Sequence, residues 1–228
     1  MPSRAYLPGL FVTGTDTGVG KSVVSASLLH AIRALGARAI GMKPVASGCE
    51  PGAQGWRNED ALLLQAASDP TPRYEDVNPY ALPQALAPEI AAAEAGIEIG
   101  LEPILAAYAR LRAQAEVMVV EGVGGWAAPI DARLDQIDLV RALDLPVVLV
   151  VGLRLGAINH ARLSARAIAA DGARFIGWIA NDIDPRMARM DENFEILRQR
   201  MPVPCWGRVP YSQRPDPARL ASSLRPQV

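Results

Sequence analysis

Apolar residues fall into two kinds of segment along the chain. Short, nearly continuous apolar runs occupy residues 10–13, 39–42, 118–120, 147–151 and 175–180. Longer segments with apolar residues every three or four positions occupy residues 20–35, 101–115, 157–170 and 187–201. Continuous runs are typical of strands buried on both faces, and the longer period is typical of amphipathic helices. The alternation predicts an α/β fold: an open, mostly parallel sheet with helices on both faces.

Two segments, 44–57 and 68–88, show neither pattern and are rich in Gly, Pro and polar residues. We predict that they are loops, and loops of this length in a compact domain are often functional. No internal repeat, low-complexity tract or linker divides the 228 residues. We therefore expect a single domain over residues 1–228, which would bury about 70% of the surface of the unfolded chain.

The charge balance excludes several classes of partner. The chain has 23 basic and 24 acidic residues and a net charge of −1, which argues against a nucleic-acid interface or a polybasic membrane surface. Cys49 and Cys205 lie far apart without metal-binding spacing, so free thiols in a reducing compartment are expected. Residues 1–10 lack a signal-peptide core, and the apolar run 145–153 is too short to span a membrane. We expect a soluble, cytoplasmic protein.

A Gly-rich segment, GTDTGVGKS at residues 14–22, separates the first predicted strand from the first helix. Such a loop can direct backbone N–H groups towards phosphates, with Lys21 reaching the β- and γ-phosphates and Ser22 binding Mg²⁺. The first glycine stands one position earlier than in the usual P-loop, where Thr15 is found here. A fortuitous Gly-rich turn is the alternative, and the dinucleotide fingerprint is absent. The loop predicts nucleoside triphosphate binding.

Of the 23 basic residues only two, Lys21 and Lys43, are lysines, so the remaining 21 are arginines. Lys43 follows the second predicted strand, and ligands of open parallel sheets bind at the carboxyl ends of strands. A lysine there can stabilise a phosphate or a developing oxyanion as a point charge. The alternative is a solvated surface lysine.

Two acidic residues are candidate magnesium ligands. Glu121 ends the strand at 118–120 and precedes a second Gly-rich loop, a position that suits a Mg²⁺ ligand in P-loop enzymes. Its alternative is a plain strand-end charge. Asp60 follows the first predicted loop, and from its position alone it is more typical of a first-turn helix acid than of a metal ligand.

Polar residues follow two further strands. Residues 155–160 open a helix whose N–H groups could hold a carboxylate, and His160 is there more typical of packing or capping than of catalysis. Asn181 and Asp182 follow the strand at 175–180 and could contact a nucleotide base. On pattern alone, a turn in which they bond their own backbone is favoured.

Five of these segments, in this order, resemble the dethiobiotin synthetase family. They are VTGTDTGVGKS (12–22), KPVASG (43–48), VEGVGGW (120–126), LGAINH (155–160) and AND (180–182), and the shorter NPY (78–80) is similar too. The resemblance runs from about residue 9 to about residue 212. It implies a P-loop NTPase-like fold and an ATP-dependent ligase of biotin biosynthesis. Such enzymes join 7,8-diaminopelargonate and CO₂ with Mg-ATP, through a carbamate and its phosphoric anhydride, and release dethiobiotin, ADP and phosphate.

The resemblance also assigns roles to residues. Lys21 and Lys43 would be catalytic, and Ser22, Asp60 and Glu121 would hold Mg²⁺. The ATP-binding set would be Gly18, Val19, Gly20, Lys21, Ser22, Val23, Asp60, Glu121, Gly122, Val123, Gly124, Asn181, Asp182, Val209, Pro210 and Tyr211. The substrate would contact Thr17 and Ser47, together with Gly156, Ala157, Ile158 and Asn159 of the partner subunit in a homodimer.

This chain departs from the family pattern at two positions. Ser22 replaces a common threonine and keeps the hydroxyl, whereas Gly18 replaces an acid found in some relatives, which leaves nucleotide selectivity open. Two other assignments remain as alternatives. A cobyrinate-type amidoligase would usually carry an additional glutaminase domain, and a partitioning-type ATPase would carry a lysine where Asp16 stands.

Overall fold

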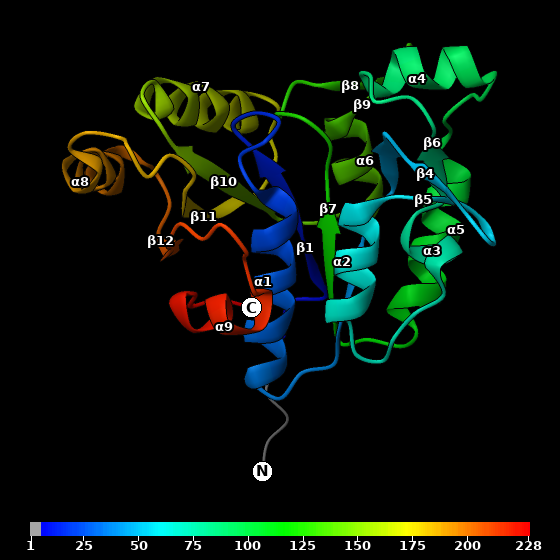
Figure 1. Cartoon of the computed structure of the whole chain (residues 1–228), viewed down its shortest axis with the longest axis horizontal. Coiled ribbons are helices and arrows are strands. Elements are labelled where there is room, and N and C mark those ends of the chain that lie inside the picture. The colour runs from blue at the N-terminus through cyan, green and yellow to red at the C-terminus, as the bar shows by residue number, and fades with distance from the viewer. Residues whose placement is uncertain (1–5) are drawn as a thin grey trace.

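A six-stranded sheet forms the centre of the molecule (Figure 1), which is described here by a computed structural model of residues 6–228. Its strands, in the order β12-β11-β10-β1-β7-β2, all pair in parallel. Their bounds are β1 (Gly9–Gly14), β2 (Ala39–Met42), β7 (Val117–Glu121), β10 (Val147–Leu153), β11 (Phe175–Asp182) and β12 (Cys205–Val209). The parallel α/β sheet predicted from the apolar runs is confirmed.

Helices cover both faces of this sheet and enclose two separate cores. One core lies under α1 (Lys21–Ala34), α2 (Glu59–Ala67) and α9 (Pro217–Leu220), and the first two helices are in front in Figure 1. The other lies under α5 (Leu101–Arg112), α6 (Gln136–Leu143), α7 (Ala157–Ala170) and α8 (Met190–Arg200). Successive strand residues contribute to opposite cores, as Phe11 does between Leu10 and Val12. Every position of β1 is therefore buried, which explains its continuous apolar sequence.

The strand register brings the candidate residues to one edge of the sheet. Met42 pairs with Val120 and Val12 pairs with Glu121, so Lys43 and Glu121 leave neighbouring strands at nearly the same height. The Gly-rich loop leaves β1 at this edge and leads directly into α1. The carboxyl ends of β1, β7 and β2 thus form a common floor for a ligand.

The two predicted loops prove to be partly ordered into short elements, so that prediction was wrong in part. They contain β3 (Val45–Ser47), the hairpin of β4 (Glu50–Gly52) and β5 (Gly55–Arg57), α3 (Tyr74–Val77) and β6 (Tyr80–Leu82). The strands β3 and β6 pair in parallel, although 32 residues separate Ser47 from Tyr80 in the chain. Elements of three or four residues are too short for an apolar period to develop, which is why the sequence did not indicate them.

Other short elements also escaped prediction. They are α4 (Pro88–Ala95), α6, β8 (Pro129–Asp131), β9 (Leu134–Asp135), β12, α9 and the 3₁₀ turn η1 (Ala221–Ser223). Within residues 6–228, no helix is long and apolar enough to cross a membrane.

Leu28 of α1 tests the core beneath that helix, because its side chain is completely buried. Leu28→Ala should lower the free energy of unfolding by about 2–5 kcal/mol, since it removes apolar contacts and leaves a cavity. Urea unfolding followed by circular dichroism measures this change. The matched control is Leu62→Ala in α2, where the leucine is 42% exposed and the loss should stay below about 1 kcal/mol. Equal losses in the two variants would contradict the assignment of this core.

Candidate functional site

The phosphate loop requires glycine where it meets β11. Gly20 has φ of 82° and precedes the first residue of α1, in the left-handed region that glycine tolerates. A Cβ atom at Gly20 would lie 2.2 Å from the side-chain nitrogen of Asn181. That same amide donates a hydrogen bond of 2.9 Å to the carbonyl of Val19. Asn181 therefore fixes the loop from β11, two strands away from β1 in the sheet, and glycine allows its close approach.

Lys21, the first residue of α1, folds back across the loop and is only 7% exposed. Its ammonium donates hydrogen bonds to the carbonyl oxygens of Asp16 at 3.0 Å and Gly124 at 2.7 Å. Burial and the nearby charge of Lys43 lower the pKa of Lys21 to about 8. The ammonium is thus held between two Gly-rich loops with an incompletely compensated positive charge, as an anion site requires.

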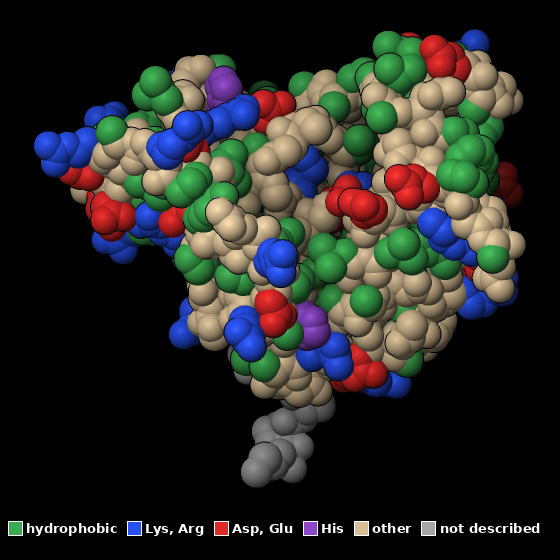
Figure 2. Space-filling model, in the orientation of Figure 1, with side chains coloured by type: hydrophobic (Ala, Val, Ile, Leu, Met, Phe, Trp, Pro, Cys, Tyr) green, Lys and Arg blue, Asp and Glu red, His purple; other side chains and the backbone are tan. Residues whose placement is uncertain are grey.

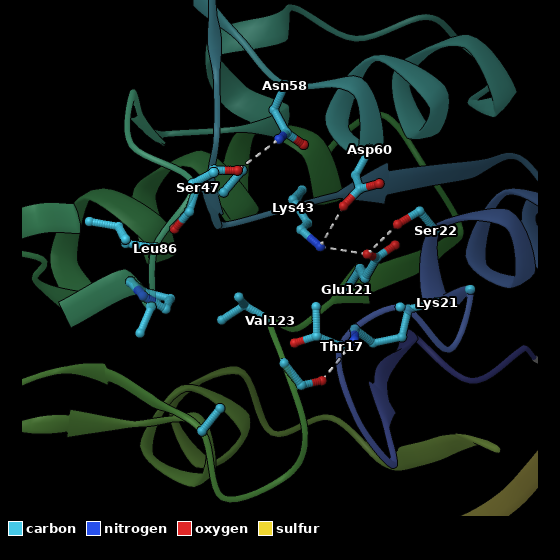
Figure 3. A pocket seen from close by; sticks show the side chains of 18 of the residues that line it. Thr17, Lys21, Ser22, Lys43, Ser47, Asn58, Asp60, Leu86, Glu121 and Val123 are labelled. Atoms are coloured by element: carbon cyan, nitrogen blue, oxygen red, sulfur yellow. Dashed lines mark hydrogen bonds and ion pairs between the residues drawn. The ribbon is translucent and has the colours of Figure 1, made fainter. Parts of the chain in front are cut away.

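Lys43 and Glu121 form the centre of the site (Figure 3), where their side chains point towards each other from adjacent strand ends. The Lys43 ammonium lies 2.5 Å from Glu121 Oε1 and 3.3 Å from Asp60 Oδ2. Ser22 donates its hydroxyl proton to Glu121 Oε1 at 2.8 Å. The Glu121 side chain is fully buried, so these contacts compensate a charge that water does not reach.

The ionisation of the cluster follows from its charges. Burial alone would lower the pKa of Lys43, but the carboxylates of Glu121 and Asp60 outweigh it and raise that pKa. Burial would raise the pKa of Asp60, yet the positive charge of Lys43 lowers it. Lys43 is therefore an ammonium and Asp60 a carboxylate at neutral pH.

Asp60 occupies the first-turn helix position that its sequence context favours. It lies in the first turn of α2, where Asn58 caps the helix by accepting the N–H of Ala61 at 3.2 Å. The cap directs the Asp60 carboxylate at Lys43, so one residue is a first-turn acid and a member of the charged cluster.

The oxygen atoms of Ser22, Asp60 and Glu121 fit a magnesium ion that is shared with a nucleotide. Glu121 Oε2 is buried and has no hydrogen-bond partner among the described residues, which leaves a lone acceptor facing the cluster. Within residues 6–228 no group of three His, Cys, Asp or Glu side chains could hold a metal by itself. Magnesium in phosphoryl-transfer sites commonly uses one or two carboxylates and completes its shell with phosphate oxygens and water.

A cavity of about 700 Å³ contains this cluster. Figure 2 shows it as a hollow in the face of the molecule, with basic side chains at its floor and acidic ones on its rim. Its polar side is formed by Thr17, Gly18, Gly20, Lys21, Ser22, Lys43, Ser47, Asn58, Asp60, Glu121 and Gly124. Its apolar side is formed by Val23, Ala46, Ala85, Leu86, Ala87, Pro88, Val123 and Ala128. The cavity thus offers charged and aliphatic surfaces to the same ligand.

A second cavity, of about 170 Å³, lies beyond α1 at the ends of β11 and β12. It includes the predicted residues Val23, Asn181, Asp182, Val209, Pro210 and Tyr211. Asn181 and Asp182 belong to β11 rather than to a turn, so the turn interpretation was wrong. Asp182 accepts from the guanidinium of Arg208 at 2.8 Å, which directs its carboxylate to a protein partner.

The structure does not bring every predicted residue to these cavities. Residues 156–159 start α7 away from the large cavity, and the Ala157 side chain is buried in a core. The side chain of Val19 also packs in a core. Gly122 lies behind the site, where a Cβ atom would be 2.1 Å from Gln136 Oε1. Any ligand contact of Ala157, Val19 or Gly122 within their own subunit would have to use backbone atoms.

Three buried amides support the site and were not predicted. Gln136 accepts the N–H of Val123 at 3.1 Å and donates to the carbonyls of Gly125 and Trp126. Asn78 donates to the carbonyl of Lys43 at 2.7 Å, and Asn58 donates to that of Ser47 at 3.3 Å. The Asn-Glu-Asp sequence at 58–60 is a recognisable helix start. The lone Gln136 carries no such signal.

Comparisons with known proteins agree with this geometry. A family model described as an AAA domain matches residues 8–219. The chain is 66% identical to the ATP-dependent dethiobiotin synthetase BioD of Xanthomonas euvesicatoria, covering 96% of this chain and 97% of that protein. It is 65% identical to the protein of the same name from Xylella fastidiosa, with coverage of 97% and 98%.

A solved structure supports the fold class. The MinC:MinD cell division protein complex of Aquifex aeolicus matches with a TM-score of 0.53 and 14% identity, covering 90% of this chain and 82% of that chain. This likeness concerns the fold alone, and it confirms the predicted P-loop NTPase-like architecture. The identity to the curated relatives extends over nearly the full length of the chain. It shows that the chain belongs to the family of ATP-dependent dethiobiotin synthetases.

Proposed function

We propose that this protein forms the ureido ring of dethiobiotin from 7,8-diaminopelargonate, CO₂ and ATP, in the penultimate step of biotin biosynthesis. Family membership supports the overall reaction. The observation that carries the site assignment is that Lys43 and Lys21 share one cavity with an acidic cluster and an aliphatic wall. Such a cavity suits transfer of a phosphoryl group to an anion on an alkyl chain.

The chemistry proceeds in three steps. One substrate amine adds to the carbon of CO₂ and loses a proton, which gives a carbamate. A carbamate oxygen then attacks the γ-phosphorus of ATP, and the bond to the bridging oxygen breaks to release ADP. Finally the second amine attacks the carbamate carbon, the bond to the phosphate oxygen breaks, and phosphate and a proton leave the closed ring.

The middle step brings two anions together, so the protein must supply positive charge. Lys21 would bind the ATP phosphates, and Lys43 would donate hydrogen bonds to the carbamate oxygen and the transferred group. Ser22, Asp60 and Glu121 would hold Mg²⁺, and the ion would neutralise part of the phosphate charge. In the structure Lys43 is bound to the carboxylates instead, so it would turn from them towards the substrates.

The rest of the ligand contacts follow from the two cavities. The aliphatic side chains around Leu86 and Val123 would pack against the alkyl chain of 7,8-diaminopelargonate. Thr17 and Ser47 would contact the polar end of this substrate. Ser47 Oγ is buried and lacks a partner among the described residues, so it is available to a ligand. Adenine would occupy the smaller cavity beside Asn181.

A homodimer completes this proposal. Residues 156–159 are absent from the lining of the large cavity, and the neighbouring Leu155 is 91% exposed and Leu163 is 52% exposed. Exposed leucines just before α7 and midway along it suit contact with a second subunit, whose substrate carboxylate would meet the helix N–H groups. Both cysteines are free thiols, which is consistent with a cytoplasmic enzyme.

The decisive assay measures phosphate release from Mg-ATP with and without 7,8-diaminopelargonate and bicarbonate. Release should require the diamine, and mass spectrometry should detect one dethiobiotin for each phosphate. Equal phosphate release with and without the diamine would contradict the proposal and favour a nucleotide-switched ATPase.

Lys43→Arg tests the second lysine. The variant should lose at least about 100-fold in turnover, because a planar guanidinium cannot replace a point ammonium at a crowded phosphoryl group. ATP binding, followed by isothermal titration calorimetry, should remain measurable. The control is Arg110→Lys, whose half-exposed side chain pairs with the buried Asp76 outside the cavity lining, and it should retain turnover. Near-normal turnover of Lys43→Arg would remove Lys43 from the mechanism.

The lowered pKa of Lys21 predicts a pH effect on binding. With a pKa of about 8 in the free protein, Lys21 loses its proton as the pH rises from 7 to 9. Bound phosphates favour the ammonium, so ATP binding should take up about half a proton at pH 8 and about 0.9 at pH 9. Calorimetry in buffers of different ionisation enthalpy measures this uptake. In Lys21→Arg the uptake should vanish, and equal uptake in both proteins would contradict the assignment.

A further inference from the structure

One ion pair joins the phosphate loop to a distant segment and has no part in the mechanism above. The guanidinium of Arg154 binds Asp16 Oδ2, across 138 positions of sequence. Arg154 stands in the connection between β10 and α7, and Asp16 stands in the loop between β1 and α1. The pair therefore links the two loops that leave adjacent strands of the sheet.

Asp16 is held through both carboxylate oxygens and its carbonyl. Its Oδ1 accepts the N–H of Thr17 at 2.7 Å, and its carbonyl accepts the Lys21 ammonium at 3.0 Å. The Thr17 N–H and the Arg154 guanidinium hold the pKa of Asp16 below its ordinary value, so the carboxylate is charged at neutral pH. A negative charge thus lies within a loop whose ligand is a polyanion.

The ion pair adds little to the stability of the fold. The side chains of Arg154 and Asp16 are 39% and 47% exposed, and pairs of this exposure contribute little to unfolding free energy. Their electrostatic effect on a ligand is a separate matter, because ATP brings several negative charges to the same loop. Without a cation beside it, the Asp16 carboxylate would repel those charges.

We propose that Arg154 is a positioning residue of the phosphate loop: by neutralising and fixing Asp16, it allows the loop to accept ATP. The guanidinium does not need to touch the nucleotide for this role. The inference rests on the proposed function only in that ATP is the ligand of this loop. It does not depend on the ring-closing reaction, because ATP binding is a property of the family.

Arg154→Gln tests the electrostatic repulsion between the Asp16 carboxylate and the ATP phosphates. At low salt the variant should bind ATP about tenfold more weakly, and ADP less than about fourfold more weakly, because the lost compensation scales with ligand charge. Arg154→Lys keeps the charge and should remain within about twofold of the parent protein. Isothermal titration calorimetry measures the dissociation constants, and thermal unfolding should show melting temperatures within about 2 °C of the parent for both variants.

Removing the negative charge should reverse the defect. Asp16→Asn keeps an oxygen that can accept the Thr17 N–H, so the double variant Asp16→Asn/Arg154→Gln should recover ATP affinity to within about threefold of the parent. The matched control is the pair Arg174 and Asp144, which is exposed and 3.3 Å apart at the amino end of β11. Arg174→Gln, alone or with Asp144→Asn, should leave ATP and ADP binding unchanged.

Unchanged ATP affinity in Arg154→Gln would overturn the proposal. So would failure of Asp16→Asn to rescue that variant, because the guanidinium would then act by direct contact with the nucleotide or by packing. These outcomes concern binding and leave ring closure by the parent protein intact. Absence of dethiobiotin from the parent protein, in contrast, would remove the proposed function without affecting the binding comparison.

Discussion

The buried carboxylate of Glu121 is the constraint on which the rest of the site depends. Its side chain has no exposure, so its charge must be compensated by protein groups rather than by water. Lys43 from the end of β2 and Ser22 from the start of α1 both reach Glu121 Oε1. A single buried oxygen thus joins two strands and a helix, and the other carboxylate oxygen remains available to a ligand.

Sheet topology makes this arrangement possible. Because β1, β7 and β2 are parallel neighbours, the residues that follow them emerge at one edge. The close approach of chains there leaves little room for side chains, and Gly122 would collide with Gln136 and Phe11 if it carried a Cβ atom. Gln136 in turn holds the second Gly-rich loop through three backbone contacts. The fold therefore determines both where charge can gather and where side chains must be absent.

Sequence reasoning recovered the parts of the molecule that are governed by local pattern. The long strands are buried on both faces, so their apolar runs were unmistakable, and the phosphate loop was framed by a strand and a helix. The short strands within residues 44–57 and 68–88 were not predicted because they depend on contacts such as that between Asn78 and the carbonyl of Lys43. The supporting roles of Gln136 and Arg154 were not predicted for the same reason, since each residue acts through partners far away in sequence. Residues 156–159 carry no signal of which subunit they would serve.

Lysine and arginine occupy different environments in this structure. Among residues 6–228 the buried cations are Lys21 and Lys43, and no arginine is buried. A compact ammonium fits between carbonyl oxygens or carboxylates without an extended planar group to accommodate, and its pKa responds to its surroundings. The guanidinium of Arg154 stays partly exposed and forms an ion pair with Asp16 of the phosphate loop. Arginine thus supplies positive charge around the site, whereas lysine supplies it within the site.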